Sequence, residues 1–300
     1  MTADIDFAGQ AAIVTGAGSG IGRATALLLA DRGARVLVND CGSDGRAGAV
    51  SREITARGGK AVANTAAIGS HATARAVAAA ALNAFGRIDI LVNNAGIARP
   101  GPFGAIGDDD LDRVMAVNLT GPFALMRAVW PAMAARGYGR IVNISSSAAM
   151  GSGISGPYAV SKAGLIGLTK DAGIAGRPLG ILVNAVMPQA YTPILDNHPN
   201  AAFRDWMRDR FPPEQVAVFI AFLVSRQMAE SGEIYAAGGG RAARIAFVEA
   251  SGYYHAALTP EAVERNFAAV SDLAGGRPAA TQADHEAIQD RFFPGRPGRG

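Results

Sequence analysis

Short runs of β-branched and apolar residues alternate with alanine-rich stretches along most of the chain. The apolar runs are continuous, as is typical of strands that helices cover on both faces. We therefore expect strands at 11–15, 35–39, 60–64, 88–93, 140–145 and 181–187. The stretches between them predict helices at 21–32, 46–57, 72–85, 111–136 and 158–175. Strand–helix–strand repetition with short connections predicts an α/β fold built on a doubly wound parallel sheet of the Rossmann type.

Proline interrupts this regular pattern after Met187. The stretch 188–213 contains five prolines and predicts a lid over the substrate, because loops of this length are usually functional. A helix at 214–225, a short strand at 233–236 and a helix from Thr259 to about residue 273 should follow. We expect a single catalytic domain at 1–275, which includes the lid, and a flexible tail at 276–300.

The charge and cysteine counts narrow the classes of function. Lys and Arg total 28 against 25 Asp and Glu, and a net charge of +3 is too small for a dedicated nucleic-acid-binding protein. The single cysteine, Cys41, excludes an internal disulfide, and four scattered histidines show no metal-ligand spacing, so we expect no bound metal. The N-terminal segment lacks the apolar core of a signal peptide, and the apolar run 216–224 is too short to span a bilayer. We expect a soluble cytoplasmic protein.

A glycine-rich segment, TGAGSGIG at Thr15–Gly22, joins the first predicted strand directly to a helix. Its glycines at 16, 18, 20 and 22 allow a tight turn and let a pyrophosphate approach the free N–H groups of the helix N-terminus. Asp40 ends the second strand, where a carboxylate accepts hydrogen bonds from ribose hydroxyls and repels a 2′-phosphate. Its sequence neighbours, Asn39 and Cys41, are not basic, and position 19 is serine. This pattern favours NAD over NADP as the cofactor.

Tyr158 and Lys162 are four residues apart in a predicted helix and therefore lie on one face of it. A phenol with a pKa of about 10 is a poor base near neutral pH, but a neighbouring ammonium and a bound nicotinamide cation would favour the phenolate. Ser145, Ser146 and Ser147 end the fifth strand, at the sheet edge where such folds bind ligands. One of their hydroxyls could donate to a substrate carbonyl. No G-x-S-x-G motif supports a serine hydrolase.

In this order the motifs resemble those of the short-chain dehydrogenase/reductase family, over about residues 8–240. The shared features are the T-G-x-x-x-G-I-G loop, Asn93-Asn94-Ala95-Gly96, Asn118, the serine cluster and Tyr-x-x-x-Lys. The resemblance implies that Tyr158 is the general acid/base and that Lys162 holds the nicotinamide ribose and lowers the phenol pKa. It also implies that Ser146 polarises the substrate oxygen and that Asn118 anchors a water linking Lys162 to solvent.

The same resemblance implies the cofactor contacts and the assembly. The implied contacts are Gly16, Ser19, Gly20, Ile21, Asp40, Asn93, Ala95, Gly96, Tyr158, Lys162 and Thr192. A homo-oligomer, tetramer or dimer, is implied through the long helices at 111–136 and 158–175. The chain departs from the family at Ala66 and Ala67, where an aspartate usually touches the adenine. Ser146 precedes Tyr158 by 12 residues, about one fewer than is common in the family. This spacing leaves Ser145 as an alternative for the role of polarising the substrate oxygen, although the register from Arg140 favours Ser146.

A narrower resemblance suggests the substrate. The segments VLVND, GGKAVAN and NAFGRIDILVNNAGI are similar to the (3R)-hydroxyacyl-CoA dehydrogenase unit of multifunctional β-oxidation enzymes. This implies an NAD-dependent oxidoreductase that interconverts a secondary alcohol and a ketone, with a (3R)-3-hydroxyacyl-CoA as the expected substrate. The alternatives are a hydroxysteroid or another bulky secondary alcohol, and, in a different class, a catalytically silent NAD-binding protein.

Side chains of the predicted lid bear on the same choice. Phe203, Trp206 and Met207 recur at helical spacing and suit either a cover for an apolar substrate or packing on the domain. The basic residues are Arg204, Arg208 and Arg210, which alternate with Asp205 and Asp209. These arginines either meet CoA phosphates or form a solvated face that compensates its own charge.

Overall fold

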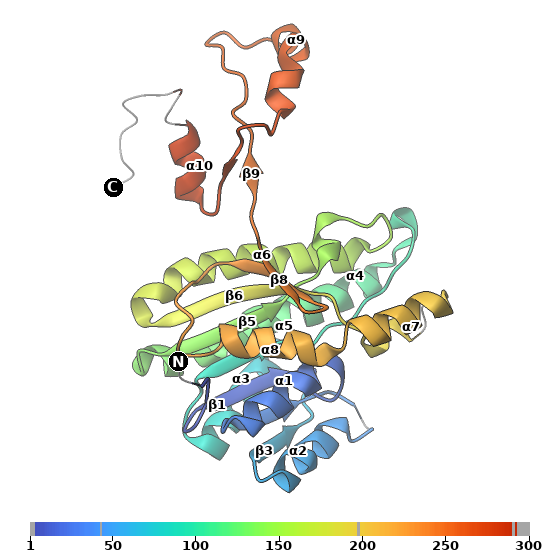
Figure 1. The fold of residues 1–300 in the computed structure, drawn as a ribbon, viewed down its shortest axis with the longest axis vertical. Coiled ribbons are helices and arrows are strands. Elements are labelled where there is room, and N and C mark those ends of the chain that lie inside the picture. Colours follow the sequence, from blue (N-terminus) through green and yellow to red (C-terminus); the bar gives the residue numbers. More distant parts are fainter. Residues whose placement is uncertain (1–3, 43, 197–198, 290–291, 293–300) are drawn as a thin grey trace. The chain divides into compact units, whose positions relative to one another are not determined.

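The protein is represented by a computed structural model, in which residues 4–42, 44–196, 199–289 and 292 are described (Figure 1). The strands are β1 (Ala11–Thr15), β2 (Arg35–Asn39), β3 (Lys60–Asn64), β4 (Ile90–Asn93), β5 (Gly139–Ile144), β6 (Ile181–Pro188), β7 (Ile234–Gly238), β8 (Arg241–Ile245), β9 (Val248–Glu249) and β10 (Arg277–Pro278). The helices are α1 (Gly20–Asp31), α2 (Arg46–Ala56), α3 (His71–Phe85), α4 (Asp108–Met115), α5 (Gly121–Ala135), α6 (Gly156–Gly176), α7 (Ala201–Arg210), α8 (Pro213–Leu223), α9 (Pro260–Ser271) and α10 (Gln282–Gln289).

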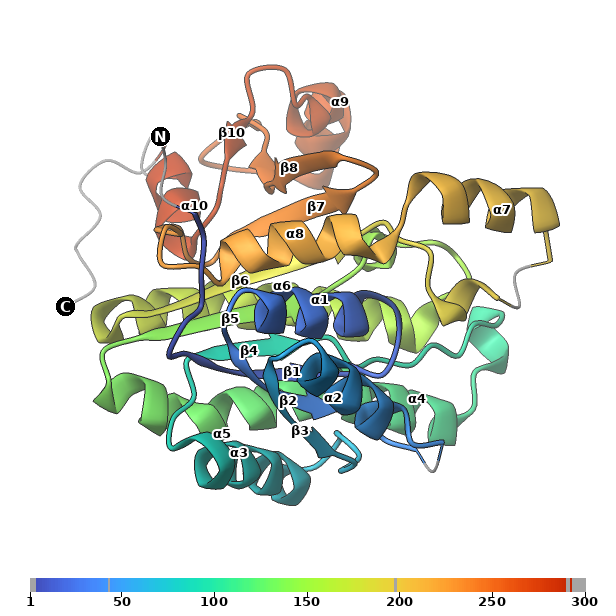
Figure 2. The ribbon, with the colours of Figure 1, turned by 60° about the horizontal axis from the view of Figure 1, so that its bottom comes forward.

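One sheet of eight strands in the order β3-β2-β1-β4-β5-β6-β7-β8 organises the described part of residues 1–244. The paired strands from β3 to β7 run parallel. The connection from β7 to β8 has only Gly239 and Gly240, so β8 returns antiparallel at the edge. Figure 2 shows helices on both faces of this sheet. The predicted doubly wound, mostly parallel α/β fold is confirmed.

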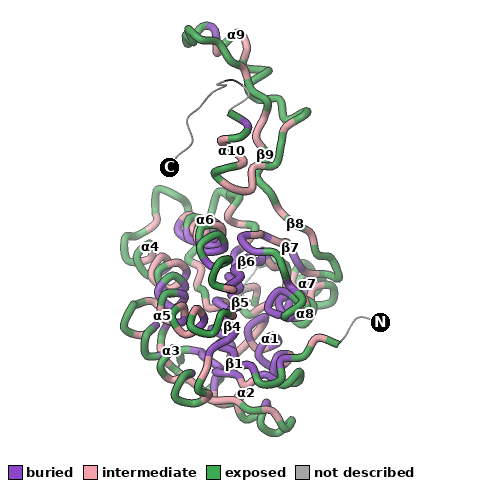
Figure 3. The backbone as a smooth tube through the Cα atoms, turned by 90° about the vertical axis from the view of Figure 1, so that its left-hand side faces the viewer, coloured by how far each residue is buried: buried purple, intermediate pink, exposed green. Residues whose placement is uncertain are grey.

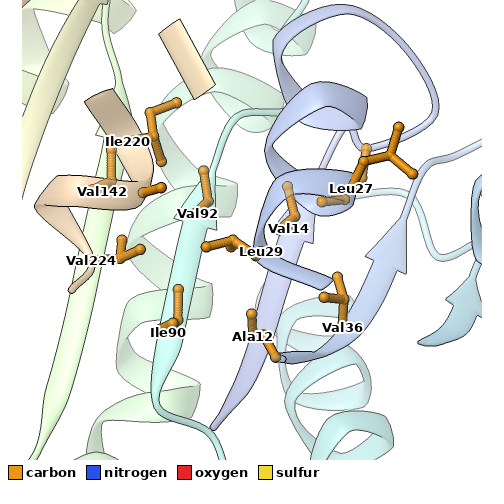
Figure 4. Close-up of a cluster of buried hydrophobic side chains, with 14 of the residues drawn as sticks. Ala12, Val14, Leu27, Leu29, Val36, Ile90, Val92, Val142, Ile220 and Val224 are labelled. Carbon is orange, nitrogen blue, oxygen red and sulfur yellow. The ribbon is translucent and has the colours of Figure 1, made fainter. Parts of the chain in front are cut away.

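The strands are apolar throughout because successive residues point into two different cores. On one face, β-strand side chains pack against α1, α2 and α8, and Figure 4 shows Val14, Val92 and Val142 there together with Leu29 and Ile220. On the other face, the residues next to these in sequence pack against α3, α5 and α6. Figure 3 shows the central strands buried. A sheet covered on both faces leaves only its strand ends free to bind a ligand.

Several predicted elements differ from the structure. The helix predicted at 111–136 is divided into α4, a π-helical turn at Ala116–Thr120, and α5. Residues 276–300 were expected to form a flexible tail, but the described part contains β10 and α10. The chain divides into compact units at 1–244 and 245–300, whereas the sequence suggested a boundary near residue 275. Within the described residues, no helix is both long enough and apolar enough to cross a membrane.

Candidate active site

The loops that follow β1 and β4 are tied together where the strand order reverses. The Thr15 hydroxyl accepts hydrogen bonds from the N–H groups of Asn94 and Ala95, each at 3.0 Å. The Asn94 amide donates to the carbonyl oxygens of Thr15 and Gly16 at 2.9 and 3.1 Å. Open α/β sheets bind ligands outside the carboxyl ends of the strands at this switch point. The structure therefore places the glycine-rich loop at the expected binding edge.

Two glycines of this loop have no room for a side chain. Gly16 has a φ of +62°, and a Cβ there would lie 2.9 Å from the Ala95 Cα. A Cβ on Gly22 would overlap the Gly16 carbonyl oxygen. Helix α1 begins at Gly20, and the Ser19 hydroxyl before it makes no capping hydrogen bond. The first N–H groups of a helix have no intrahelical acceptor, so this bare backbone fits the pyrophosphate of a dinucleotide.

Asp40 lies under the same loop, nearly buried, with an exposed fraction of 9%. Its Oδ2 accepts a hydrogen bond from the Gly18 N–H at 2.9 Å. Arg46, the first residue of α2, places its Nη2 3.6 Å from the Asp40 Oδ1. Arg46 is not a sequence neighbour of Asp40, and the turn into α2 returns it to the Asp40 carboxylate.

Thr192 and Asn93 were both expected to contact the cofactor. A Cβ on Gly20 would lie 3.2 Å from the Thr192 Cγ2, so Thr192 reaches the start of α1. The Asn93 side chain instead lies inside the sheet, where its Nδ2 donates to the Asn143 Oδ1 at 2.9 Å. Ile21 is buried in the core on the α1 face. Only the main chain of Asn93 is therefore placed for a contact with a ligand at this edge.

Tyr158, Lys162 and Ser146 meet at the carboxyl end of β5. The Ser146 hydroxyl accepts a hydrogen bond from the Ala148 N–H at 3.1 Å, and it lies close enough to the Tyr158 hydroxyl to lower the pKa of that phenol. The Lys162 Nζ donates to the Ile144 carbonyl oxygen at 2.7 Å and lies 5.5 Å from the centre of the Tyr158 ring. The Ser145 hydroxyl points elsewhere and donates to the Lys162 carbonyl oxygen at 2.7 Å. The structure thus places Ser146, and not Ser145, beside the phenol.

Asn118 reaches the same place from the π-helical turn. Its Oδ1 accepts from the Ile97 N–H at 2.8 Å, and its Nδ2 donates to the Ile97 carbonyl at 2.9 Å and to the Ser161 hydroxyl at 3.2 Å. Ser161 in turn donates to the Tyr158 carbonyl at 2.8 Å. A Cβ on Gly96 would lie 3.4 Å from both the Asn118 Oδ1 and the Lys162 Nζ. Ser161 could not be predicted from the sequence, because a single serine within a helix belongs to no motif.

The π-helical turn has a local cause in Pro122. In an α-helix the N–H of residue 122 would donate to the carbonyl of Asn118, but proline has no N–H and its ring clashes with that carbonyl. The chain widens instead, so that the Gly121 N–H bonds to the Ala116 carbonyl five residues earlier. Single π turns inside α-helices often mark functional sites. Here the turn leaves the Asn118 carbonyl without its α-helical donor.

Burial controls the electrostatics of this cluster. It raises the pKa of Tyr158 above its ordinary value of 10.0, and the hydrogen bond from Ser146 acts in the opposite direction. It lowers the pKa of Lys162 from 10.5 to about 8, because the ammonium is fully buried. The family resemblance implied that Lys162 lowers the phenol pKa. Within the chain itself the loss of solvation is the larger effect.

The predicted lid at 188–213 includes α7, and several side chains of this helix already contact neighbours within the lid. Arg208 donates to the Asp205 carboxylate at 2.7 Å and to the Tyr191 hydroxyl at 2.9 Å, and it stacks on the Tyr191 ring. Trp206 packs against Phe211 with ring centres 5.0 Å apart. This arrangement favours the self-compensated interpretation for Arg208. Residues 197–198 of the predicted lid lie outside the described residues.

A doubly wound sheet with a glycine-rich loop at its switch point, and a serine, a tyrosine and a lysine beside that loop, defines a dinucleotide-dependent oxidoreductase. The chain belongs to the short chain dehydrogenase family, whose family model matches residues 10–200. The family resemblance noted in the sequence is confirmed, and with it an enzyme that uses a nicotinamide cofactor.

Three similar proteins extend the comparison. The mouse peroxisomal multifunctional enzyme type 2 is 35% identical over 290 residues, which are 91% of this chain and 38% of the mouse protein. A subunit of (2S)-[(R)-hydroxy(phenyl)methyl]succinyl-CoA dehydrogenase from Thauera aromatica is 37% identical over 221 residues, covering 71% of this chain and 88% of that one. The crystal structure of a short chain dehydrogenase from Mycobacterium avium matches with a TM-score of 0.77 and 35% identity, over 91% of this chain and 97% of that chain. This chain thus spans well under half of the mouse protein.

Proposed function

We propose that the protein is an NAD-dependent dehydrogenase that interconverts a secondary alcohol and a ketone, most simply a (3R)-3-hydroxyacyl-CoA and its 3-keto form. The observation that carries this proposal is the Tyr158 side chain, with Ser146 beside its hydroxyl and the buried Lys162 Nζ 5.5 Å from its ring centre, at the sheet edge that also carries the dinucleotide loop. General acid/base catalysis needs such a group within hydrogen-bond reach of the substrate oxygen.

The glycine-rich loop and its surroundings would hold the dinucleotide. Gly16, Ser19 and Gly20 would face the pyrophosphate. Asp40 would accept hydrogen bonds from the hydroxyl groups of the adenosine ribose. At the nicotinamide end, the candidates are Ala95, Gly96, Tyr158, Lys162 and Thr192, with Ile21 and Asn93 contributing through their main chains. Asp40 supports the choice of NAD, because its carboxylate is nearly buried and would meet a 2′-phosphate with a like charge. Bound NAD would supply the hydride acceptor and a positive charge near the phenol.

The side chains divide the proton chemistry among them. Ser146 would donate a hydrogen bond to the substrate oxygen, and Tyr158 would take the hydroxyl proton as its general base. Because the phenol is buried and its pKa is raised, the phenolate needs positive charge close by, which Lys162 supplies in part. The Asn118 side chain already makes its own hydrogen bonds, because its Oδ1 accepts from Ile97 and its Nδ2 donates to Ile97 and Ser161. The water of the proton relay would therefore bind the main-chain carbonyl of Asn118.

Three observations support a CoA thioester as the substrate. The sequence segments around β2, β3 and β4 resemble the hydroxyacyl-CoA dehydrogenase unit, and the Thauera relative is by name a dehydrogenase of a hydroxyl-bearing CoA thioester. The apolar side chains of α7, with Phe203 and Trp206 partly exposed, would suit a fatty-acyl chain. A bulky hydroxysteroid would use the same catalytic residues, so the substrate must be measured.

The direct test measures NADH formation with two substrate panels, (3R)-3-hydroxyacyl-CoAs of several chain lengths and hydroxysteroids, with Tyr158→Phe as the control. We expect turnover of the thioesters and a loss of about a thousandfold or more in the variant. Turnover of steroids alone would keep the reaction and refute the substrate. Tight NADH binding without turnover of either panel would instead indicate a silent dinucleotide-binding protein.

We further propose a homo-oligomer, a dimer or a tetramer, that uses α5 and α6. Each helix carries large apolar side chains that are exposed in the single chain, namely Phe123 on α5 and Val160 and Ile174 on α6. Exposed apolar surface of this kind is typical of subunit interfaces. A monomeric mass in light scattering would refute this assembly. The cytoplasm remains our prediction for the compartment, although the mouse relative is by name peroxisomal.

A further inference from the structure

The adenosine end of the site contains a basic side chain that the sequence motif does not include. Arg46 opens α2, and its Cβ is 2.7 Å from the position that a Cβ on Gly18 would take. It therefore stands against the glycine-rich loop on the side where Asp40 lies. The Arg46 side chain has an exposed fraction of 46%, so a ligand in solvent can reach it.

Arg46 pairs closely with one carboxylate and only loosely with a second. Its Nε pairs with the Asp44 Oδ2 at 2.6 Å, whereas its Nη2 is 3.6 Å from the Asp40 Oδ1, beyond hydrogen-bond distance. Asp40 has its own donor in the Gly18 N–H, so it stays in place when Arg46 moves. One edge of the guanidinium therefore remains available for another anion.

We propose that Arg46 is a second specificity-determining residue of the cofactor site, which acts against Asp40 by offering a partner to the 2′-phosphate of NADP. This inference rests on the proposed function. Asp40 and a 2′-phosphate compete for the same space, and the phosphate carries more than one negative charge at neutral pH. An arginine can bind two phosphate oxygens at once, and the bond is stronger than one between neutral groups. NAD remains preferred, and Arg46 limits how far NADP is rejected.

The arrangement predicts two opposite changes in cofactor preference. Removing Asp40 takes away the repulsion and leaves Arg46 unopposed, so Asp40→Ala should bind NADPH more tightly. Removing Arg46 takes away the phosphate partner, so Arg46→Ala should raise the preference for NADH over NADPH by roughly tenfold, as expected for one charge-assisted contact at a half-exposed site. The two side chains touch, so their effects should not be additive.

The test compares dissociation constants for NADH and NADPH, measured by nicotinamide fluorescence, in a double-mutant cycle of Asp40→Ala and Arg46→Ala. Arg52→Ala is the matched control, because this exposed arginine lies on the same helix with the same charge. We expect the NADPH affinity gained in Asp40→Ala to disappear when Arg46→Ala is added, while Arg52→Ala leaves the preference unchanged. If the gain persists in the double variant, or if Arg52→Ala removes it equally, Arg46 has no such role.

The same measurements separate this inference from the proposed function. Tight NADH binding by the wild type, with an unchanged cofactor preference in Arg46→Ala, would refute the role of Arg46 and leave the dehydrogenase intact. Failure of the wild type to bind either dinucleotide would refute both together. Because equilibrium binding needs no substrate, an incorrect choice of substrate class cannot affect the outcome.

Discussion

The Lys162 ammonium donates to the carbonyl oxygen of Ile144, 2.7 Å away, and burial rather than a carboxylate determines its pKa. A neutral carbonyl stabilises a buried positive charge only in part, which is why this pKa falls to about 8. Lys162 therefore titrates in the pH range where the enzyme would be assayed. The bond also joins α6 to the end of β5, two elements that supply Tyr158 and Ser146.

The depressed pKa of Lys162 predicts how stability changes with pH. Between about 8 and 10.5 the unfolded chain binds more protons at this lysine than the folded chain does, so the free energy of unfolding rises with pH. From pH 7.5 to 9.5 the gain should be about 2 kcal/mol relative to Lys162→Met, which has no such group. Urea unfolding of both proteins at several pH values measures the difference. Parallel curves would show that the lysine is not desolvated.

Ser145 and Ser146 form a natural pair of variants with different expected effects on kcat. Ser145→Ala removes a fully buried hydrogen bond to the Lys162 carbonyl and should cost about 1 kcal/mol of stability, with most of the kcat kept. Ser146→Ala removes the neighbour of the phenol and should lower kcat by about a hundredfold or more. It also removes the cap that the hydroxyl provides to the Ala148 N–H and should cost about 1 kcal/mol, so kcat is the quantity that distinguishes the two variants. Thermal unfolding and steady-state kinetics on both variants decide this. The reverse pattern would transfer the catalytic role to Ser145.

Pro122→Ala tests why the Asn118 carbonyl lacks the donor that an α-helix would give it. Alanine restores an N–H that can donate to this carbonyl and close an ordinary α-helical turn. We expect kcat to fall about tenfold, as for the loss of one proton-relay contact, while the dissociation constant of NADH stays unchanged. A split of this kind distinguishes a relay effect from general disruption of the site.

Pro131→Ala is the control for that variant, because Pro131 lies in the same helix and is exposed. It should raise the melting temperature, since a proline inside a helix removes a hydrogen bond, and it should leave kcat as it was. Equal kcat values for Pro122→Ala and the wild type would mean that the relay does not use the Asn118 carbonyl.

Gly22→Ala tests the fit of the loop to a dinucleotide. The new Cβ would overlap the Gly16 carbonyl oxygen, so the loop must move, at a cost of about 2 kcal/mol in stability and with a large loss of NADH affinity. Gly48→Ala is the matched control, a glycine of α2 whose Cβ position meets only the end of the flexible Arg52 side chain, at 3.3 Å. It should stabilise the protein by about 0.5 to 1 kcal/mol and bind NADH normally. Calorimetry and titration measure both effects.

The sheet and most helices follow from the sequence because strands covered on both faces are apolar without interruption. β1, β2 and β3 begin and end where the pattern predicts. The break between α4 and α5 was missed because alanine and leucine continue through it, although Pro122 was a visible signal. β8 was missed because its residues are short or charged and lie mostly exposed at the edge, where no core imposes an apolar pattern.

The candidate site likewise contains residues that the sequence predicts and residues that it does not. Tyr158, Lys162 and the glycines form motifs at fixed spacing, so the sequence places them together. Arg46 and Ser161 act through contacts between separate turns, and no spacing rule connects them to Asp40 or Asn118. The Asn93 side chain was assigned to the cofactor by resemblance, but it lies inside the sheet, where its Nδ2 donates to Asn143 and its Oδ1 is buried without a partner.

That buried amide has a mechanical consequence for the enzyme. Asn93 donates to Asn143, and Asn143 donates to the Thr169 hydroxyl at 3.0 Å. These hydrogen bonds form a chain through the interior from β4 through β5 to α6. Removing any acceptor in this chain would leave a buried donor without a partner, which costs more free energy than the hydrogen bond itself contributes. The strand that leads to the cofactor loop and the helix that carries the phenol are thereby braced against each other. The position of Tyr158 relative to the dinucleotide loop is therefore fixed before the cofactor or the substrate binds.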